Sequence, residues 1–101
     1  MKYIVVFHPL VNIDYKDAYA WYEQKQEGLG EKFLKAVREK IDKITLQPES
    51  FGSRENKRFR EAQVDTFPFL IVYKVVKKSG VIYVASIHHY KKHPKSKYRK
   101  I

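Results

Sequence analysis

The apolar positions of this chain change their spacing twice, and each change predicts a new element. Residues 2–7 form a short run of β-branched and aromatic side chains, which is typical of a strand buried on both faces. Over residues 10–27 the apolar spacing becomes three to four, as on one face of a helix. This helical stripe consists of Val11, Tyr15, Ala18 and Tyr22, and it is widened by Ile13, Tyr19 and Trp21.

A second amphipathic helix is predicted over residues 29–46. Its apolar stripe consists of Phe33, Val37, Ile41 and Ile44, with Leu34 beside it. Gly28 suits the left-handed position that ends the first helix, and Pro48 blocks continuation of the second. Because only the short segment 28–30 joins the two helices, we expect them to form an antiparallel hairpin.

Three strand signals follow a polar loop at residues 48–57. They cover residues 58–64, 67–76 and 81–88, and the last two are the strongest runs of β-branched and aromatic residues. Residues 77–80, Lys-Lys-Ser-Gly, predict a tight hairpin turn between them. The sequence therefore predicts an α+β domain with an N-terminal strand, an antiparallel helical hairpin and a three-strand antiparallel meander. All the strands form one twisted sheet, because a lone first strand would leave its backbone groups unsatisfied.

The size and composition of the chain suit one such domain. Its 101 residues are the length of a single small domain, and 15% aromatic residues let a short chain build a sizeable core. We expect the helical stripes to pack on inward-facing strand positions. The predicted core contains Trp21, Tyr22, Phe33, Val37, Ile41, Ile71, Tyr73 and Val84.

Composition also excludes several kinds of chemistry. The chain has no cysteine, which excludes disulfides, thiolate metal sites and cysteine nucleophiles. The first apolar run is too short for a signal peptide, and no run approaches the roughly 20 apolar residues of a membrane span. We therefore expect a cytoplasmic protein that has no cofactor and does not enter a membrane.

The net charge of +10, from 21 lysines and arginines against 11 acidic residues, is large for so short a chain. Such a charge attracts nucleic acid, an acidic protein segment or a membrane surface, unless it serves only solubility. The basic residues gather late in the chain. The candidates for binding nucleic acid or an acidic partner are Arg54, Lys57, Arg58, Lys91, Lys92, Lys95, Lys97 and Arg99.

Five motifs follow one another along nearly the whole chain. They are DAYAWYE at 17–23, LGEKFL at 29–34, the I-x-x-x-P-x-x-F … R pattern at 44–60, FPFLIVY at 67–73, and Ile87-His88 with a basic tail containing Pro94. In order and spacing they resemble the RelE/ParE superfamily of toxins from bacterial type II toxin–antitoxin systems. The resemblance implies the fold predicted above and an acidic or amphipathic antitoxin that wraps the toxin.

The same resemblance leaves the molecular target open. RelE-like members cleave messenger RNA on the ribosome, whereas ParE-like members inhibit DNA gyrase without known catalytic side chains. The leading hypothesis from the sequence is a metal-independent RNA endonuclease, with gyrase inhibition and a degenerate, non-toxic binding module as alternatives. RelE-like proteins usually carry more cations in their central strands, whereas residues 69–76 contain only Lys74. The tail, in turn, is more basic than gyrase binding obviously requires.

RNA cleavage without a metal needs an acid, a base and a fixed cation beside one phosphate. Arg60 is the candidate cation, because its guanidinium can bind two phosphate oxygens, and it shares a strand face with Arg58. His88 or His89 would be the acid or base, since only one of two adjacent strand residues can face the cleft that Arg60 faces. Tyr98 would stack on or protonate the substrate.

Each candidate also has a structural interpretation. Arg60 would lie on a solvated sheet face or form a salt bridge with the antitoxin. His88 would form a structural hydrogen bond, and the Tyr98 ring would pack on the sheet. A metal site is not expected at His88, His89 and His93, because adjacent histidines rarely share an ion and no acidic ligand lies near them in the sequence.

Overall fold

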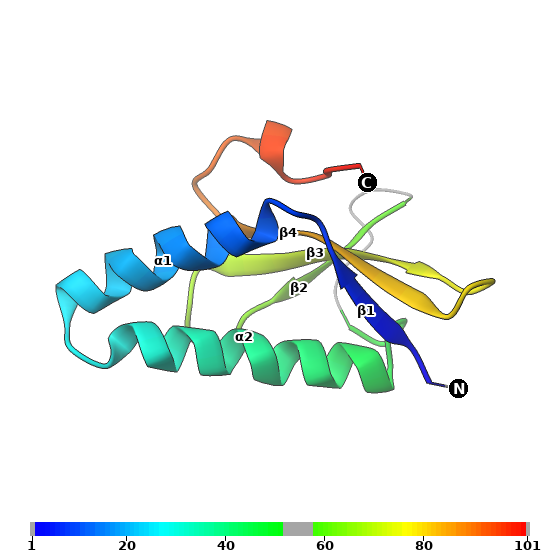
Figure 1. Ribbon diagram of the computed structural model, residues 1–101, viewed down its shortest axis with the longest axis horizontal. Coiled ribbons are helices and arrows are strands. Elements are labelled where there is room, and N and C mark those ends of the chain that lie inside the picture. The colour runs from blue at the N-terminus through cyan, green and yellow to red at the C-terminus, as the bar shows by residue number, and fades with distance from the viewer. Residues whose placement is uncertain (1, 52–57, 101) are drawn as a thin grey trace.

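The fold has two layers, a helical hairpin and a four-stranded sheet (Figure 1). The computed structural model describes residues 2–51 and 58–100. Its elements are β1 (Ile4–Phe7), α1 (Val11–Lys25), α2 (Leu29–Leu46), β2 (Arg60–Gln63), β3 (Phe69–Val76), β4 (Val81–His89) and the short 3-10 helix η1 (Pro94–Ser96). The predicted fold class and element order are confirmed.

The sheet has the strand order β1-β4-β3-β2. The last three strands form the predicted antiparallel meander, with Arg60 opposite Tyr73 and Val76 opposite Val81. The first strand, β1, pairs parallel with β4, so the sheet is mixed. This pairing is possible because the helical hairpin provides the long crossover that two parallel strands need.

The hairpin turn between α1 and α2 depends on two glycines and one acid. Gly28 adopts the left-handed conformation, with φ of 85°, as the sequence predicted. The backbone N–H groups of Gly28 and Gly30 donate to the Glu23 carboxylate at 3.1 and 2.9 Å. A Cβ at Gly30 would lie 2.8 Å from the Tyr19 ring, so only glycine lets the two helices approach this closely.

The main core lies between the hairpin and the sheet. Phe33 is fully buried, and its ring centroid lies 5.4, 5.3 and 4.8 Å from those of Tyr22, Phe67 and Phe69. The remaining predicted core residues that belong to this cluster are Val37, Ile41, Ile71, Tyr73 and Val84. The predicted core is therefore confirmed, with one exception.

The exception is Trp21, whose side chain is 58% exposed. Ile13 is exposed as well, and the residues that α1 buries are Val11, Asp14 and Ala18. Each residue advances the helix by about 100°, which places position 13 about 130° and position 21 about 50° from the centre of this stripe. The prediction that both widen the buried face was wrong, and an acidic residue takes the core position instead.

The prediction that the first strand is buried on both faces was also wrong. In β1, Ile4 is 68% and Phe7 44% exposed, while Val5 is partly buried against the core. β1 is an edge strand with β4 as its one neighbour in the sheet. Its apolar run reflects the preference of β-branched residues for a pleated surface, which does not require burial.

Candidate functional site

The two faces of the sheet carry different groups. We call the face under α1 and α2 the helix face, and the opposite face the tail face. The tail face has its own small core of Phe59, Val72, Tyr83 and Ala85, against which Tyr98 of the C-terminal tail packs. β4 contains a β-bulge, because Val72 lies opposite Ser86 whereas Tyr73 lies opposite Val84, which leaves Ala85 as an extra residue. The extra residue reverses the alternation of side chains in the rest of β4, and so decides which face each later residue occupies.

The C-terminal tail folds back beside β4 (Figure 1) and is hydrogen-bonded to the tail face. The Tyr83 hydroxyl donates to the Arg99 carbonyl at 2.8 Å, and the Ser86 hydroxyl donates to the Lys97 carbonyl at 2.8 Å. Both hydroxyls belong to buried residues of β4, so these bonds attach the tail to the sheet at two positions, Lys97 and Arg99.

The side chains of two tail residues, Lys97 and Tyr98, converge on Glu61 of β2. The Lys97 ammonium lies 2.7 Å from Glu61 Oε1, and the Tyr98 hydroxyl donates to Glu61 Oε2. The Glu61 side chain is only 3% exposed, so its charge needs these partners to remain buried. Lys97, predicted to bind nucleic acid or an acidic partner, and Tyr98, predicted to stack on or protonate the substrate, therefore have structural contacts within the chain.

Arg99 forms a second ion pair, with Asp14 of α1. Its guanidinium binds both carboxylate oxygens, at 2.8 and 2.9 Å, and also donates to the Ala85 carbonyl. The Asp14 carboxylate accepts a third hydrogen bond, at Oδ2, from the backbone N–H of Ile87 at 3.0 Å. This buried carboxylate thus joins the first helix, β4 and the tail. The sequence does contain a signal for this buried carboxylate. Asp14 lies on the same face of α1 as Val11 and Ala18, so an acidic residue stands at a core-facing position.

The two adjacent histidines of β4 lie on opposite faces. His88 is buried on the tail face, and its Nε2–H donates to the Lys92 carbonyl at 3.2 Å. Burial lowers the pKa of the His88 imidazole below its ordinary value of 6.5, and the hydrogen bond to the Lys92 carbonyl offsets this only in part. His89 lies on the helix face, where its ring packs edge-on against Phe69 with a centroid distance of 5.0 Å.

Arg60 of β2 lies on the helix face, because residues two apart in a strand share a face and Ala62 is buried in the core on that side. Its guanidinium donates to the Phe51 carbonyl at 3.4 Å. The Tyr73 hydroxyl also contacts that carbonyl, at 2.9 Å, and burial raises the pKa of Tyr73 to about 12. The structure does not bring Arg60 together with Tyr98, which lies across the sheet.

The remaining basic candidates divide into three groups. Lys91, Lys92 and Lys95 are exposed in the segment that follows β4. Arg54 and Lys57 lie outside the described residues. Arg58 borders an open hollow, described next, which the sequence did not predict as a unit.

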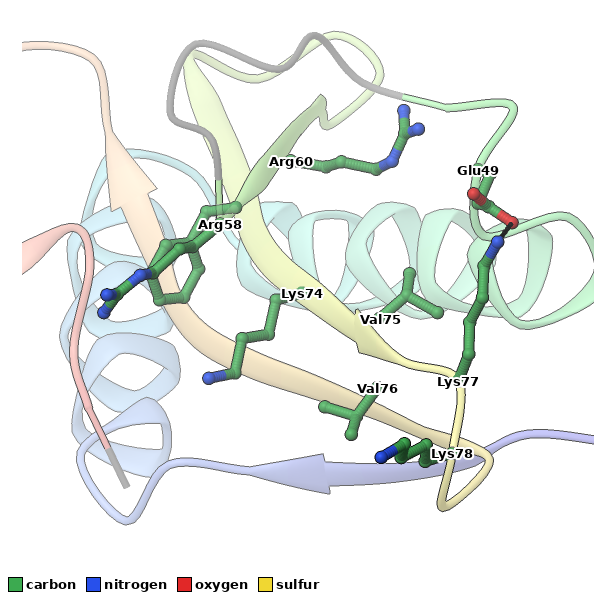
Figure 2. A pocket seen from close by; sticks show the side chains of 9 residues that line it. Glu49, Arg58, Arg60, Lys74, Val75, Val76, Lys77 and Lys78 are labelled. Carbon is green, nitrogen blue, oxygen red and sulfur yellow. Dashed lines mark ion pairs between the residues drawn. The ribbon is translucent and has the colours of Figure 1, made fainter.

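The basic hollow is an open concavity with a volume of about 550 Å³ (Figure 2). It lies where β2 begins and β3 ends. Its lining residues are Glu49, Arg58, Phe59, Arg60, Lys74, Val75, Val76, Lys77 and Lys78. These residues come from three separated segments, which is why inspection of the sequence did not group them.

Charges of one sign dominate this hollow. Among the lining residues that the structure describes, the single acid is Glu49, which is paired with Lys77 at 3.0 Å, as Figure 2 shows. The Lys74 ammonium lies 5.8 Å from the centroid of the Phe59 ring and 5.7 Å from that of Tyr83. The arrangement can bind an anionic group between several cations while aliphatic side chains line the space among them.

Two other kinds of site were sought over residues 2–51 and 58–100. Within these ranges no three His, Asp or Glu side chains are arranged to hold a metal ion. No helix in the same part of the chain combines the length and the apolar character needed to cross a bilayer.

The helical hairpin on one mixed sheet is the fold that the resemblance of the motifs implied. A profile of the family described as "ParE toxin of type II toxin-antitoxin system, parDE" matches residues 5–94. The chain therefore belongs to the ParE toxin family. No curated protein sequence matches the chain significantly.

Solved structures agree on the fold. The chain is similar to one from the chromosomal ParDE toxin–antitoxin system of P. aeruginosa, with a TM-score of 0.78, 14% identity, and coverage of 89% of this chain and 98% of that one. It is also similar to a mutant of the E. coli toxin RelE in the free state, with a TM-score of 0.67, 16% identity, and coverage of 90% and 86%.

The lowered pKa of His88 predicts a pH dependence of stability. In the unfolded chain His88 binds a proton near pH 6.5, whereas in the folded chain it does so only at lower pH. The free energy of unfolding is therefore highest above pH 6.5, and part of it is lost as the pH falls from 6.5 through the pKa of the folded state. We expect His88→Gln, which can still donate to the Lys92 carbonyl, to lose less stability than the wild type between pH 7 and pH 5. Urea denaturation at both pH values tests this, and equal losses would contradict it.

Proposed function

We propose that this chain is a toxin that acts by binding DNA gyrase, and that it does not cleave RNA. Membership of the ParE toxin family supports the gyrase target, through the activity that the sequence resemblance implies for ParE-like proteins. This proposal reverses the order of the two hypotheses that the sequence supported, and it implies a protein that acts in the cytoplasm, where bacterial gyrase works.

The separation of the candidate catalytic groups is the observation that carries the proposal. Metal-free RNA cleavage requires a cation, an acid or base and a third polar group around one phosphate. Arg60 lies on the helix face, whereas His88 and Tyr98 lie on the tail face and bond to Lys92 and Glu61. His89 shares the helix face with Arg60, but His89 lies opposite Phe69 and Arg60 lies opposite Tyr73, four positions further along β3. A protein that inhibits by binding needs a shaped surface but no such convergence.

A cognate antitoxin, acidic or amphipathic, is the second part of the proposal. The net charge of +10 favours an acidic partner, and the similar ParDE structure comes from a two-component toxin–antitoxin system. We expect the product of a neighbouring open reading frame to form a complex with this chain and to suppress its toxicity on co-expression.

Induction in a permissive host tests the activity. We expect growth arrest with intact messenger RNA and accumulating gyrase-linked DNA breaks, measured by northern blotting and by trapping of gyrase on DNA. Arg60→Ala should remain toxic, because among the described residues it removes one long side-chain hydrogen bond, to the Phe51 carbonyl, worth about 0.5–1.5 kcal/mol.

The opposite outcome is equally specific. Rapid loss of messenger RNA that disappears in a folded Arg60→Ala variant would overturn the proposal and select the RelE-like activity. A wild-type protein that is harmless and binds no neighbouring gene product would contradict both the target and the antitoxin.

A further inference from the structure

We infer that the free edge of β1 is the contact surface of a symmetric homodimer, in which the β1 strands of two copies of this chain pair antiparallel. The four-stranded sheets of the two copies would then form one continuous sheet across the interface. The inference goes beyond the proposed function and does not depend on whether gyrase is the target.

The backbone of β1 has one unpaired edge. Among the described residues β1 pairs with β4 alone, and it lies at the end of the strand order (Figure 1). The Ile4 N–H donates to the Gly80 carbonyl at 2.8 Å, and the His8 N–H donates to a β4 carbonyl at 2.9 Å. Because successive residues of a strand direct their backbone groups to opposite sides, Val5 and Phe7 direct theirs to the free edge. This edge offers the hydrogen bonds that another strand needs.

The side chains along this segment are apolar and exposed. Of the eight large apolar side chains that are exposed in the described part of the chain, five lie between positions 4 and 13. They are Ile4, Val6, Phe7, Leu10 and Ile13. Soluble proteins usually protect an open edge strand with lysine, proline or a bulge. β1 contains neither lysine nor proline, and its register with β4 is regular, so the edge is left open to a further strand.

The lack of charge favours a second copy over a charged partner. Residues 3–13 contain no Lys, Arg, Asp or Glu, although such residues make up 32% of the chain. Two copies that each carry a net charge of +10 repel one another, and contact through an uncharged segment adds least to this repulsion. An acidic partner would gain no ion pair from residues 3–13.

The side chains of β1 are suited to pair with their own copies. Ile4 and Val6 share the tail face, because Val5 between them packs against the core on the helix face. A two-fold axis through the strand pair places these aliphatic side chains beside their copies, and cross-strand pairs of β-branched residues stabilise a sheet. Since β1 has only four residues, the interface is small, and we expect a weak dimer in exchange with the monomer.

A neutral hollow extends this surface at the end of β1. It has a volume of about 300 Å³ and contains no acidic residue, lysine or arginine. Its lining residues are Phe7, His8, Pro9, Val11, Asn12 and Tyr15. In an antiparallel pair the end of one β1 lies beside the start of the other, so this hollow would receive side chains from the start of the partner strand.

Sedimentation of the full-length protein over a wide range of concentrations tests the inference. We expect the average mass to rise from that of the monomer to that of the dimer. Raising the salt concentration should strengthen the dimer, because salt screens the repulsion between two cationic copies, whereas it weakens association between opposite charges. An average mass that stays at the monomer value under all conditions would overturn the inference.

Charged variants of β1 locate the interface. Ile4→Lys with Val6→Lys changes side chains that are 68% and 40% exposed, so the fold should persist, which circular dichroism checks. We expect the dissociation constant of the dimer to rise by about tenfold or more, because like charges would face one another across the axis. The matched control is Trp21→Lys with Leu46→Lys, which adds the same two charges at exposed apolar positions outside β1. Equal weakening by both variants, or none by the β1 variant, would contradict the interface.

A mixing experiment separates lost pairing from lost folding. Ile4→Glu with Val6→Glu introduces acids at the same two positions and should also weaken the dimer when this variant is alone. Mixed with the lysine variant, it should form a heterodimer, because opposite charges then meet across the strand pair. That heterodimer should weaken as salt rises, opposite to the wild type. A mixture that stays monomeric would count against pairing through β1.

Amide hydrogen exchange tests the strand pairing itself. The N–H groups of Val5 and Phe7 should exchange more slowly as the protein concentration rises, because the partner strand covers them. The Ile4 N–H, already bonded to Gly80, should change far less and serves as the internal control. A dimer that leaves the exchange of Val5 and Phe7 unchanged would show that the copies meet elsewhere, and the inference would fail.

Discussion

Replacing Asp14 with alanine is expected to lower the free energy of unfolding by about 3–5 kcal/mol, the usual effect of breaking a buried ion pair on one side. The substitution leaves the Arg99 guanidinium, only 12% exposed, without its carboxylate. It also removes the acceptor of the Ile87 backbone N–H, whose loss adds the cost of an unsatisfied buried donor.

Asp17→Ala is the matched control, because Asp17 is an exposed acid one turn further along the same helix. Its effect should stay within about 0.5 kcal/mol, as for most surface changes. Urea denaturation followed by circular dichroism measures both variants. Similar losses for Asp14→Ala and Asp17→Ala would show that the Asp14–Arg99 pair does not hold the tail to the body of the protein.

A loss of this size would leave little reserve in a small domain, whose total stability is typically about 5–15 kcal/mol. The tail would be affected first, because Arg99 is its link to α1 and Lys97 its ionic link to β2. Proteolysis of the folded Asp14→Ala protein should therefore cut near the tail before it cuts elsewhere.

Phe33→Ala is expected to have an effect of similar size, about 3–5 kcal/mol, as for other large-to-small changes in closed cores. Phe33 is fully buried and packs against the rings of Tyr22, Phe67 and Phe69. These three rings come from α1, from the segment before β3 and from β3 itself, so the cavity would open where the two layers meet.

Trp21→Ala is the informative comparison, because it deletes a larger ring from the surface. Trp21 is 58% exposed, and the Lys25 ammonium lies 4.4 Å from the centroid of its ring. The loss should be about 0.5–1 kcal/mol, the value of an exposed cation–π contact. Thermal unfolding of both variants measures the difference, and a larger loss for Trp21→Ala would contradict the assignment of the core.

The sequence by itself determined the elements, because their signals are local. Helical spacing located Phe33, Val37 and Ile41 in the core, and Gly28 marked the turn between the helices. Strand runs located β3 and β4 to within two residues at each end. These predictions succeeded because the periods of helices and strands follow from backbone geometry alone, which neighbouring residues already impose.

The tertiary structure alone decided which apolar positions are buried and which charges meet. The exposure of β1 and Trp21 depends on the order of strands and on the rotation of α1 against the sheet, neither of which a local pattern records. Arg99 was predicted to bind a partner, yet it pairs with Asp14 across 85 positions of the chain. The basic hollow likewise exists only because folding brings the loop before β2 beside the end of β3, where side chains distant in sequence share one electrostatic field.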